Sequence, residues 1–432
     1  MCFLIISYAD ARQYRPSVFF FRRIGIIMNW LSFFKLPSRI AAVLAGVGML
    51  GGVFSPASAE AGYRKAPEKY QDVDVRVLQN GPTLLFSDSP EMVYEDGILY
   101  KDIVEGEGRV FFHHVNGTRN TKKLAVLMRP VNNRTTITWG CRGIGDPDKL
   151  YYVSARKGQT RYFNDYKELW KKAHKNELKE KRDKRRNNTA RNKELPDYSF
   201  YQKVSDLPLT TLAKGEYLEV LSQGRNMQHA GARLKPEQLL TGMFDFHANH
   251  PVEVVIMMCD PEEDVAKFSK DGAVLPMDEH PLRGTYRNAD LTYIIKEPIQ
   301  MKWYQARALC MAGSDDPYFL TGTDRMTGTE TVNHGNYGVV YHLIYSVAGE
   351  HPIQMGINPW GGEFYGAGLV MSEEKADIVN IPGKKTFFGK GDEVDDVFLH
   401  SPNHKRKDTE FIWSPPGASN LPIRVFWTVN KL

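Results

Sequence analysis

Apolar residues in this chain come mainly in short runs bounded by Gly, Asp, Asn and Pro, and this pattern constrains the fold most. Three of them are RVFFHHV (109–115), KKLAVLM (122–128) and TTITWG (135–140), each of strand length. Between MVYE and ILYKDIV lies Asp96-Gly97, which is the strongest local signal for a hairpin turn. The sequence therefore predicts a mainly β protein with antiparallel sheets.

One stretch departs from the strand pattern and predicts a helix. Between Tyr152 and Trp170, large apolar residues recur at spacings of three, four and seven. The apolar face then ends, and Asp165 to Glu194 holds twelve basic and six acidic residues. Because Lys171 to Lys193 offers little apolar area, we expect it to be a mobile, solvated segment that folding does not require. The alternative is an electrostatic contact with an anionic polymer or lipid head groups.

These patterns divide the chain into predicted domains. The expected fold is mainly β, with two antiparallel β-sandwich-like units and one helical, highly charged insertion. The N-terminal β domain is expected over 76–222 with its helical excursion at 149–194, the C-terminal β region over 223–432, and a linker over 60–75. The pairs His250-Pro251 and His351-Pro352 follow apolar strands 101 residues apart. They suggest a duplicated β unit, although similar hairpin chemistry explains them almost as well.

The segment from Met28 to Ala59 has the features of an export signal. Lys35 and Arg39 form a basic head, residues 40–54 form an apolar core, and Ala57-Ser58-Ala59 is a small-residue cleavage site. We expect residues 1–27 to lie upstream of the true start, cleavage near Ala59, no membrane span afterwards, and a secreted or periplasmic product. Of 56 basic and 51 acidic residues, the first 59 positions hold six and one, which leaves 50 of each. This balance gives no general case for nucleic acid binding.

Motifs for metal binding and catalysis are weak. Cys141, Cys259 and Cys310 have no CxxC spacing, so we expect no disulfide framework or zinc site and interpret these cysteines as small buried apolar residues. The adjacent His113 and His114 should point to opposite faces of a strand, so they cannot both bind one ion. The sequence holds no HExxH motif and no Gly-x-Ser-x-Gly elbow. We therefore predict no catalytic residue, no metal site and no cofactor.

The richest candidate for ligand binding is the segment from residue 321 to residue 368. Trp360 lies between Pro359 and Gly361, in a context that can leave an indole partly exposed, and Tyr365 follows closely. With Asn336 and Tyr337, these residues could stack on a sugar ring and hydrogen-bond its hydroxyl groups. The alternative is that Trp360 is a buried plug that closes the end of a sandwich.

Four segments carry a resemblance to a known family: Asp96 to Thr118, KKLAVLMRPVNN, Leu275 to Tyr286 and Asn333 to Leu343. In them the chain resembles uncharacterised exported bacterial proteins that are often named for an associated copper amine oxidase N-terminal-like stalk domain. The resemblance implies no oxidase activity here, because the Asn-Tyr pair at 336 and 337 is followed by Gly338 instead of an acid.

The expected function is therefore that of an exported, non-enzymatic binding module of the cell envelope or the secreted fraction. An envelope glycan or another anionic polymer would be its partner. The alternative is an envelope hydrolase that acts on glycan or peptide, with catalytic residues scattered over loops.

Overall fold

The structure is a computed structural model that describes residues 64–65, 70–184, 204, 207–221, 232–301, 306–313, 319–349, 351–372, 375–382, 389–390, 393–400 and 408–429. Side chains are described from residue 71 onward, apart from those of 174–184 and 389–400. All of these residues belong to one compact unit, Ala59–Leu432. The predicted export segment lies outside the described residues.

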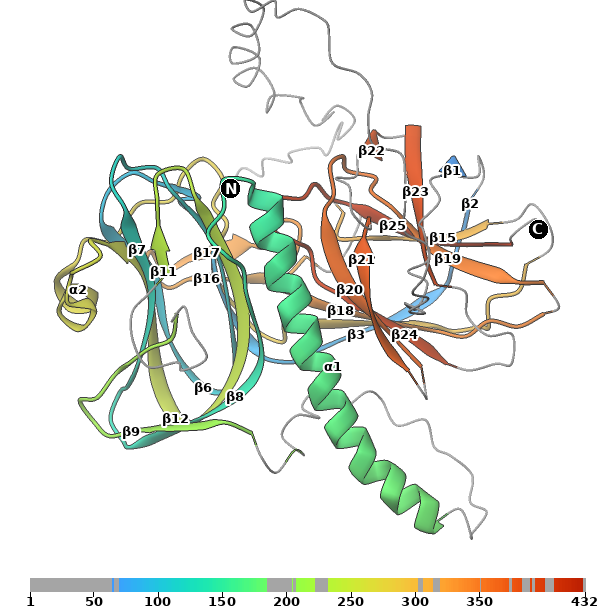
Figure 1. The fold of residues 1–432 in the computed structure, drawn as a ribbon, viewed down its shortest axis with the longest axis horizontal. Coiled ribbons are helices and arrows are strands. Elements are labelled where there is room, and N and C mark those ends of the chain that lie inside the picture. The colour runs from blue at the N-terminus through green and yellow to red at the C-terminus, as the bar shows by residue number, and fades with distance from the viewer. Residues whose placement is uncertain are drawn as a thin grey trace, which may run out of the picture. The chain divides into compact units, whose positions relative to one another are not determined.

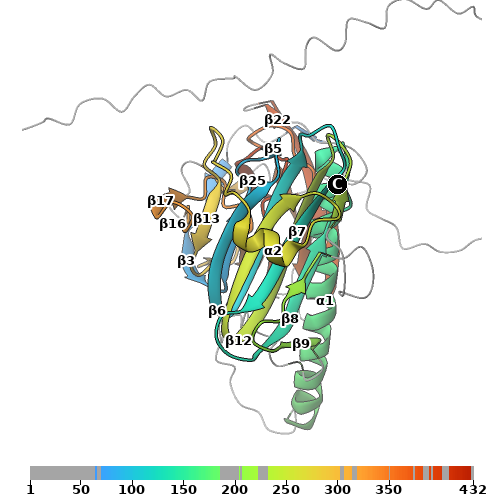
Figure 2. The same cartoon turned by 90° about the vertical axis from the view of Figure 1, so that its left-hand side faces the viewer.

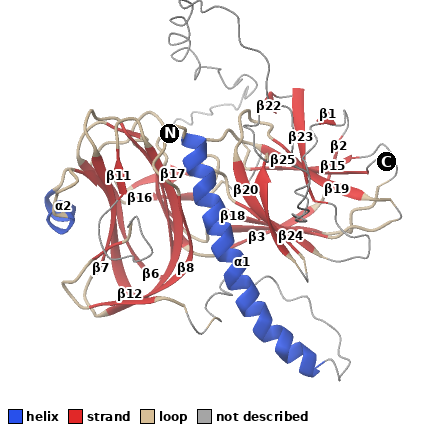
Figure 3. Ribbon diagram, in the orientation of Figure 1, coloured by secondary structure: helices blue, strands red, loops and turns tan. Residues whose placement is uncertain are grey.

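The described chain is mainly β with two helices, which confirms the predicted fold class (Figure 3). The strands form sheets of twelve, six and seven strands. The twelve-stranded sheet contains β4 (Thr83–Ser87), β5 (Met92–Val93), β6 (Gly97–Asn116), β7 (Lys122–Pro130), β8 (Thr135–Ile144), β9 (Leu209–Leu212), β10 (Leu218–Glu219), β11 (Ala232–Leu234), β12 (Leu239–Cys259), β13 (Arg283–Tyr286), β16 (Thr321–Asp324) and β17 (Thr329–Val332). The six-stranded sheet contains β3 (Val75–Asn80), β14 (Asp290–Ile295), β18 (Val340–Tyr345), β20 (Gly366–Met371), β21 (Ala376–Ile381) and β24 (Thr409–Trp413). The seven-stranded sheet contains β1 (Arg64–Lys65), β2 (Tyr70–Asp72), β15 (Ala306–Met311), β19 (Ile353–Asn358), β22 (Gly389–Lys390), β23 (Glu393–His400) and β25 (Ile423–Val429).

Two long antiparallel strands, β6 and β12, form the centre of the twelve-stranded sheet (Figure 2). On its other edge, β12 pairs with β8 in its first half and with β7 in its second half. The pairing partner of β12 changes at a register shift between Ala248 and Val252, so His250-Pro251 lies at an irregularity inside one strand. A strand that bends at such a point can serve two parts of a folded sheet. The predicted boundary at residue 222 is therefore wrong, because β12 lies beyond it and yet is central to the N-terminal sheet.

Two turn predictions from the sequence are also wrong. Asp96-Gly97 closes no hairpin, since Gly97 is the first residue of β6 and β5 pairs in parallel with the far end of that strand, Met92 opposite Val115. Nor do the two His-Pro pairs mark a repeat. His351-Pro352 connects β18 to β19, which belong to different sheets, whereas the other pair sits within β12.

The predicted helical excursion is present as α1 (Tyr151–Lys184), which contacts β8, β12, β20 and β21 (Figure 1). Its first half packs closely, because a Cβ on Gly143 of β8 would lie 2.0 Å from the carbonyl oxygen of Gly158. Tyr162 and Phe163 are buried on the packed face. The segment from Lys171, which we expected to be mobile, is helical as far as Lys184, since each added residue extends the backbone hydrogen-bond ladder. Residues 185–193 of that prediction lie outside the described residues.

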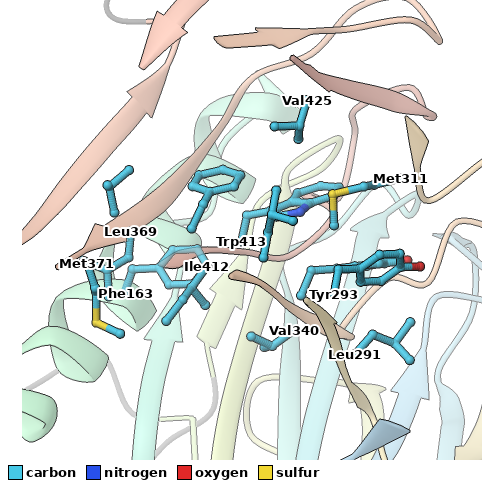
Figure 4. Packing of buried hydrophobic residues seen from close by; sticks show 14 of the residues in the cluster. Phe163, Leu291, Tyr293, Met311, Val340, Leu369, Met371, Ile412, Trp413 and Val425 are labelled. Carbon is cyan, nitrogen blue, oxygen red and sulfur yellow. The ribbon is translucent and has the colours of Figure 1, made fainter. Parts of the chain in front are cut away.

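The buried apolar residues form separate clusters that match the layers. One lies among the six-stranded sheet, the seven-stranded sheet and α1 and extends to Phe86 and Phe111 of the twelve-stranded sheet. Figure 4 shows Trp413 of β24, Met311 of β15 and Phe163 of α1 within it. A second cluster lies on one face of β6, β7 and β12 and includes Phe112, Val126 and Val254. A third cluster packs the opposite face of these strands against α2 (Val265–Asp271). The alternation of Val126 and Leu127 between two clusters is the period of a strand buried on both faces.

No helix within the described residues is long and apolar enough to cross a membrane.

Candidate functional site

Trp360 lies in the turn after β19 and is half-buried. The guanidinium carbon of Arg424, from β25, lies 3.1 Å from the centre of its ring, so one indole face stacks on a cation. The turn itself is held by backbone bonds, from Gly361 N to Pro422 O at 2.8 Å and from Asn420 N to Glu363 O at 2.8 Å. The turn around the indole is therefore held in place.

Glycine is required within this turn. A Cβ on Gly361 would lie 2.2 Å from the backbone carbonyl carbon of Leu421, so the two segments pack backbone against backbone. Gly362 adopts a φ of +127°, a conformation that L residues with a side chain rarely adopt. The Gly-Gly pair after Trp360 thus explains how a large aromatic residue stays at a surface turn.

Tyr365, at the other end of the turn, is also half-buried. Its ring meets that of Tyr152 edge-on, with centres 5.2 Å apart, and the guanidinium carbon of Arg156 lies 4.2 Å from its centre. Its backbone N donates to the hydroxyl oxygen of Ser419 at 3.0 Å. Tyr365 therefore belongs to a surface built with the first turns of α1, which the sequence did not associate with it.

Asn336 and Tyr337 are used inside the protein. Asn336 is fully buried; its side-chain oxygen accepts from Leu320 N at 2.9 Å, and its amide donates to the hydroxyl of Tyr341 at 2.8 Å. The Tyr337 hydroxyl donates to Ser419 O at 3.1 Å. The expectation that Asn336 orients a sugar is wrong, because a buried amide must satisfy its polar atoms locally. Tyr337 instead supports the loop that carries Ser419.

A group of carboxylates that the sequence did not single out gathers at the end of β4. Asp278 accepts from the hydroxyl of Ser89 at 2.9 Å and from the backbone N of Glu91 at 2.8 Å. Burial raises the pKa of Asp88, and the charges of Glu91 and Asp278 raise it further. Burial and Asp278 likewise raise the pKa of Glu91, whereas His280 lowers it. We call Asp88, Glu91 and Asp278 the acidic cluster.

Two buried histidines border the acidic cluster. His114 forms a 2.8 Å hydrogen bond with the Ser87 hydroxyl and a 2.9 Å bond with Pro90 O, so both ring nitrogens are satisfied. His113 Nε2 lies 3.9 Å from a carboxylate oxygen of Glu91, while its Nδ1 is buried with no partner among the described residues. Burial lowers the pKa of His113 to about 3 and that of His114 to about 4. Both rings are therefore neutral near pH 7 and add no positive charge beside the acidic cluster.

One exposed and one half-buried tyrosine lie in the segments that precede β6 and begin α1. Tyr94 is 73% exposed and Leu150, at the start of α1, is 53% exposed. Tyr151 is half-buried, and its pKa is raised by burial and then by the charges of Glu91, Glu237 and Tyr94. The charges of Glu91 and Tyr94 thus act on Tyr151, although these residues come from different segments. No periodic pattern signals such a group, so the sequence alone could not find it.

A second polar group is entirely buried. Arg109 of β6 donates to Asp245 of β12 and to Asp290 of β14, each at 2.7 Å, and it also reaches the hydroxyl of Tyr162 in α1 at 3.2 Å. Burial raises the pKa of Asp290, and Arg109 opposes that shift. We call Arg109, Asp245, Asp290 and Tyr162 the buried node. Its buried side chains link the twelve-stranded sheet, the six-stranded sheet and α1.

A cavity of about 20 Å³ lies between α1, β12 and the loop from Ser414 to Gly417. This volume holds about one water molecule. Tyr162 and Met243 line it, and it is too small for a sugar ring.

Metal binding has no support in the described part of the chain, where no three His, Cys, Asp or Glu side chains are placed to hold one ion. Cys141 and Cys259 are buried, as expected, whereas Cys310 of β15 is exposed, so the prediction for it is wrong. No disulfide joins these three cysteines.

Comparison with known proteins gives no family for this chain. No family description matches it, and no curated protein does. Among solved structures, the chain is similar to two mutants of Bacillus subtilis oxalate decarboxylase OxdC at 9% identity. One covers 90% of each chain with a TM-score of 0.14, and the other covers 88% of each chain with a TM-score of 0.13. Scores this low carry no argument about fold or activity.

Proposed function

We propose that this chain is an exported, non-enzymatic binding module of the cell envelope or the secreted fraction, and that its ligand is a glycan. The turn from Trp360 to Tyr365 is the proposed binding surface. Each of its two rings is half-buried and rests against an arginine, and backbone hydrogen bonds hold the turn. Aromatic faces in a fixed position stack on sugar rings with little loss of conformational entropy.

The observation that carries the proposal is the partial exposure of Trp360. A buried plug would leave no face for a ligand, whereas the Trp360 ring is only half-buried, with Arg424 against one of its faces. Glycan-array binding by the purified protein should be lost or weakened in Trp360→Ala. The thermal midpoint of that variant should fall only modestly, because the ring is not in the core.

A matched control is Tyr217→Ala, which removes an exposed aromatic ring far along the chain from the turn. This variant should bind as the unaltered protein does. Equal binding by all three proteins, or no glycan binding by any of them, would contradict the proposal.

Export is tested separately from binding. N-terminal sequencing of the protein recovered from the periplasm or medium should begin near Glu60 if the signal is cleaved after Ala59. Recovery of a chain that starts at Met1 or Met28 in the cytoplasm would contradict this part.

The alternative of an envelope hydrolase draws support from the acidic cluster. Glu91 has a raised pKa, and the Asp278 carboxylate accepts hydrogen bonds from the Ser89 hydroxyl and from the backbone N of Glu91. Two carboxyl groups in contrasting environments are what an acid and base pair requires. Release of soluble product from purified cell wall, lost in Glu91→Gln, would favour the hydrolase.

A further inference from the structure

Two arginines flank the turn that carries the proposed binding surface. Arg424 of β25 lies opposite Asn358, the last residue of β19, so it belongs to the strand beside the one that leads into the turn. Its guanidinium carbon lies 3.1 Å from the centre of the Trp360 ring. At the other end of the turn, the guanidinium carbon of Arg156, from α1, lies 4.2 Å from the centre of the Tyr365 ring. Each aromatic ring of the surface therefore has a positive charge against it.

An arginine stacked on an aromatic ring offers a ligand more than the ring alone does. A guanidinium is planar, keeps its charge in proteins and carries five N–H donors. When its flat face lies on an aromatic ring, these donors point outward in the plane of the guanidinium and remain able to donate. A carboxylate matches this fork with its two oxygens and accepts two parallel hydrogen bonds. The pair of ring and arginine thus combines an apolar surface with donors for an anion.

The two arginines have different surroundings, and both favour a negative ligand. Arg424 and Trp360 are each half-buried, so a ligand that contacts the indole also meets the guanidinium. Arg156 is only 9% exposed and donates to Pro382 O at 3.4 Å. A buried charge is screened less by salt than an exposed one, so Arg156 adds attraction beside Tyr365. Within the turn itself, the carboxylate of Glu363 opposes the two arginines.

We propose that the surface from Trp360 to Tyr365 binds an acidic sugar of the uronic acid class. This inference rests on the proposed glycan-binding function and names the class of the ligand. The sugar ring packs on the half-buried aromatic residues, and its carboxylate accepts hydrogen bonds from the guanidinium of Arg424. Arg156 supplies further attraction. A uronic acid with an esterified carboxylate keeps the ring and loses the charge that selects this ligand.

The test compares oligomers of galacturonic acid and of glucuronic acid with their methyl esters, by calorimetry on the purified protein at pH 7. The acids should bind about fivefold more tightly than the esters, as expected for one partly exposed ion pair. This preference should shrink as salt is added, because exposed charges are screened. Equal binding of acids and esters, or binding of a neutral glycan alone, would overturn this inference and leave glycan binding in place. If the protein binds no glycan at all, both proposals are overturned.

Substitution of Arg424 separates its charge from its support of the indole. Arg424→Gln should abolish the preference for the acid, whereas Arg424→Lys keeps the charge and should retain part of the preference. If Arg424→Gln weakens binding of the acid and of the ester by the same factor, this arginine only positions Trp360 and the inference is overturned. Arg233→Gln is the matched control, because it removes an exposed arginine of β11 in the twelve-stranded sheet. It should leave the preference unchanged.

Glu363→Gln tests the sign of the effect. The turn should survive this change, because it is the backbone O of Glu363 that accepts from Asn420 N. Removal of the negative charge should strengthen binding of the acid about two- to fivefold and leave binding of the ester unchanged. Weaker binding of the acid by this variant would contradict the role of charge.

A polymer without sugar rings tests the contribution of the aromatic residues. Polyglycerol phosphate carries negative charge but offers no ring to pack on Trp360 or Tyr365. It should bind more weakly than the uronic acid oligomers at equal ionic strength. Tighter binding of polyglycerol phosphate than of the uronic acids would show that charge alone selects the ligand, and it would overturn the uronic acid assignment.

Discussion

Arg109→Met is the most informative perturbation of this fold. The Arg109 side chain is 3% exposed and donates six hydrogen bonds, three of them to the carboxylates of Asp245 and Asp290. Methionine fills similar volume but leaves two buried carboxylates without their cation. Breaking a buried ion pair from one side costs about 3–5 kcal/mol, and we expect a loss of that size near pH 7. For a unit of this length, the thermal midpoint should fall by roughly 4–6 °C.

The pH dependence of the loss tests the cause. The pKa of Asp290 is already raised in the folded protein by burial, and removing Arg109 raises it further. A carboxyl whose folded pKa is raised favours the folded state at a pH below its unfolded pKa, and that contribution disappears as the pH rises through the folded pKa. The deficit of Arg109→Met should therefore be smaller at pH 4.5 than at pH 7.5.

Two other variants provide the comparison in urea unfolding followed by tryptophan fluorescence. Asp290→Asn leaves Arg109 paired with Asp245 and should cost much less, about 1 kcal/mol. Lys296→Met breaks an exposed pair with Asp74 at 2.8 Å and should cost at most about 1 kcal/mol. A loss of less than about 1 kcal/mol in Arg109→Met, or a deficit that grows at acidic pH, would refute the reasoning.

Three further predictions concern packing, protonation and thiol chemistry. Gly417→Ala should lower the thermal midpoint, because its Cβ would lie 2.2 Å from Nδ1 of His113, and overpacking costs about 1–3 kcal/mol; an unchanged midpoint would contradict the close contact. Asp88→Asn should raise the free energy of unfolding relative to the unaltered chain, and this gain should be larger at pH 7 than at pH 4. The reason is that the raised pKa of the Asp88 carboxyl makes the unaltered chain lose stability as the pH rises. A thiol reagent should modify Cys310 in the native protein and spare Cys141 and Cys259, as mass spectrometry of the digested product would show.

Local sequence patterns determined the elements of this protein well. The runs at β6, β7 and β8 and the apolar spacing at the start of α1 follow from periods of 2 and 3.6 residues, which neighbouring residues set among themselves. The short apolar runs bounded by turn residues likewise predicted a mainly β fold. Local patterns did not predict which strands pair, because the Asp96-Gly97 turn and the His250-Pro251 pair have hairpin chemistry but close no hairpin. The partner of a strand depends on distant segments, and β12 lies more than a hundred residues from β6 and β7, with which it pairs.

The candidate sites also divide into those that the sequence indicated and those that only the tertiary structure formed. The Pro-Trp-Gly-Gly pattern around Trp360 indicated a half-exposed ring, because glycines that allow a tight turn are visible in the sequence. The burial of Asn336, however, followed from the hydrogen bonds it makes to Leu320 and Tyr341 once the sheets had formed. The acidic cluster likewise exists only because the loops of Asp88 and Asp278 meet in space. Local chemistry thus fixes conformation over a few residues, whereas convergence of charged groups depends on long-range packing, which only the tertiary structure decides.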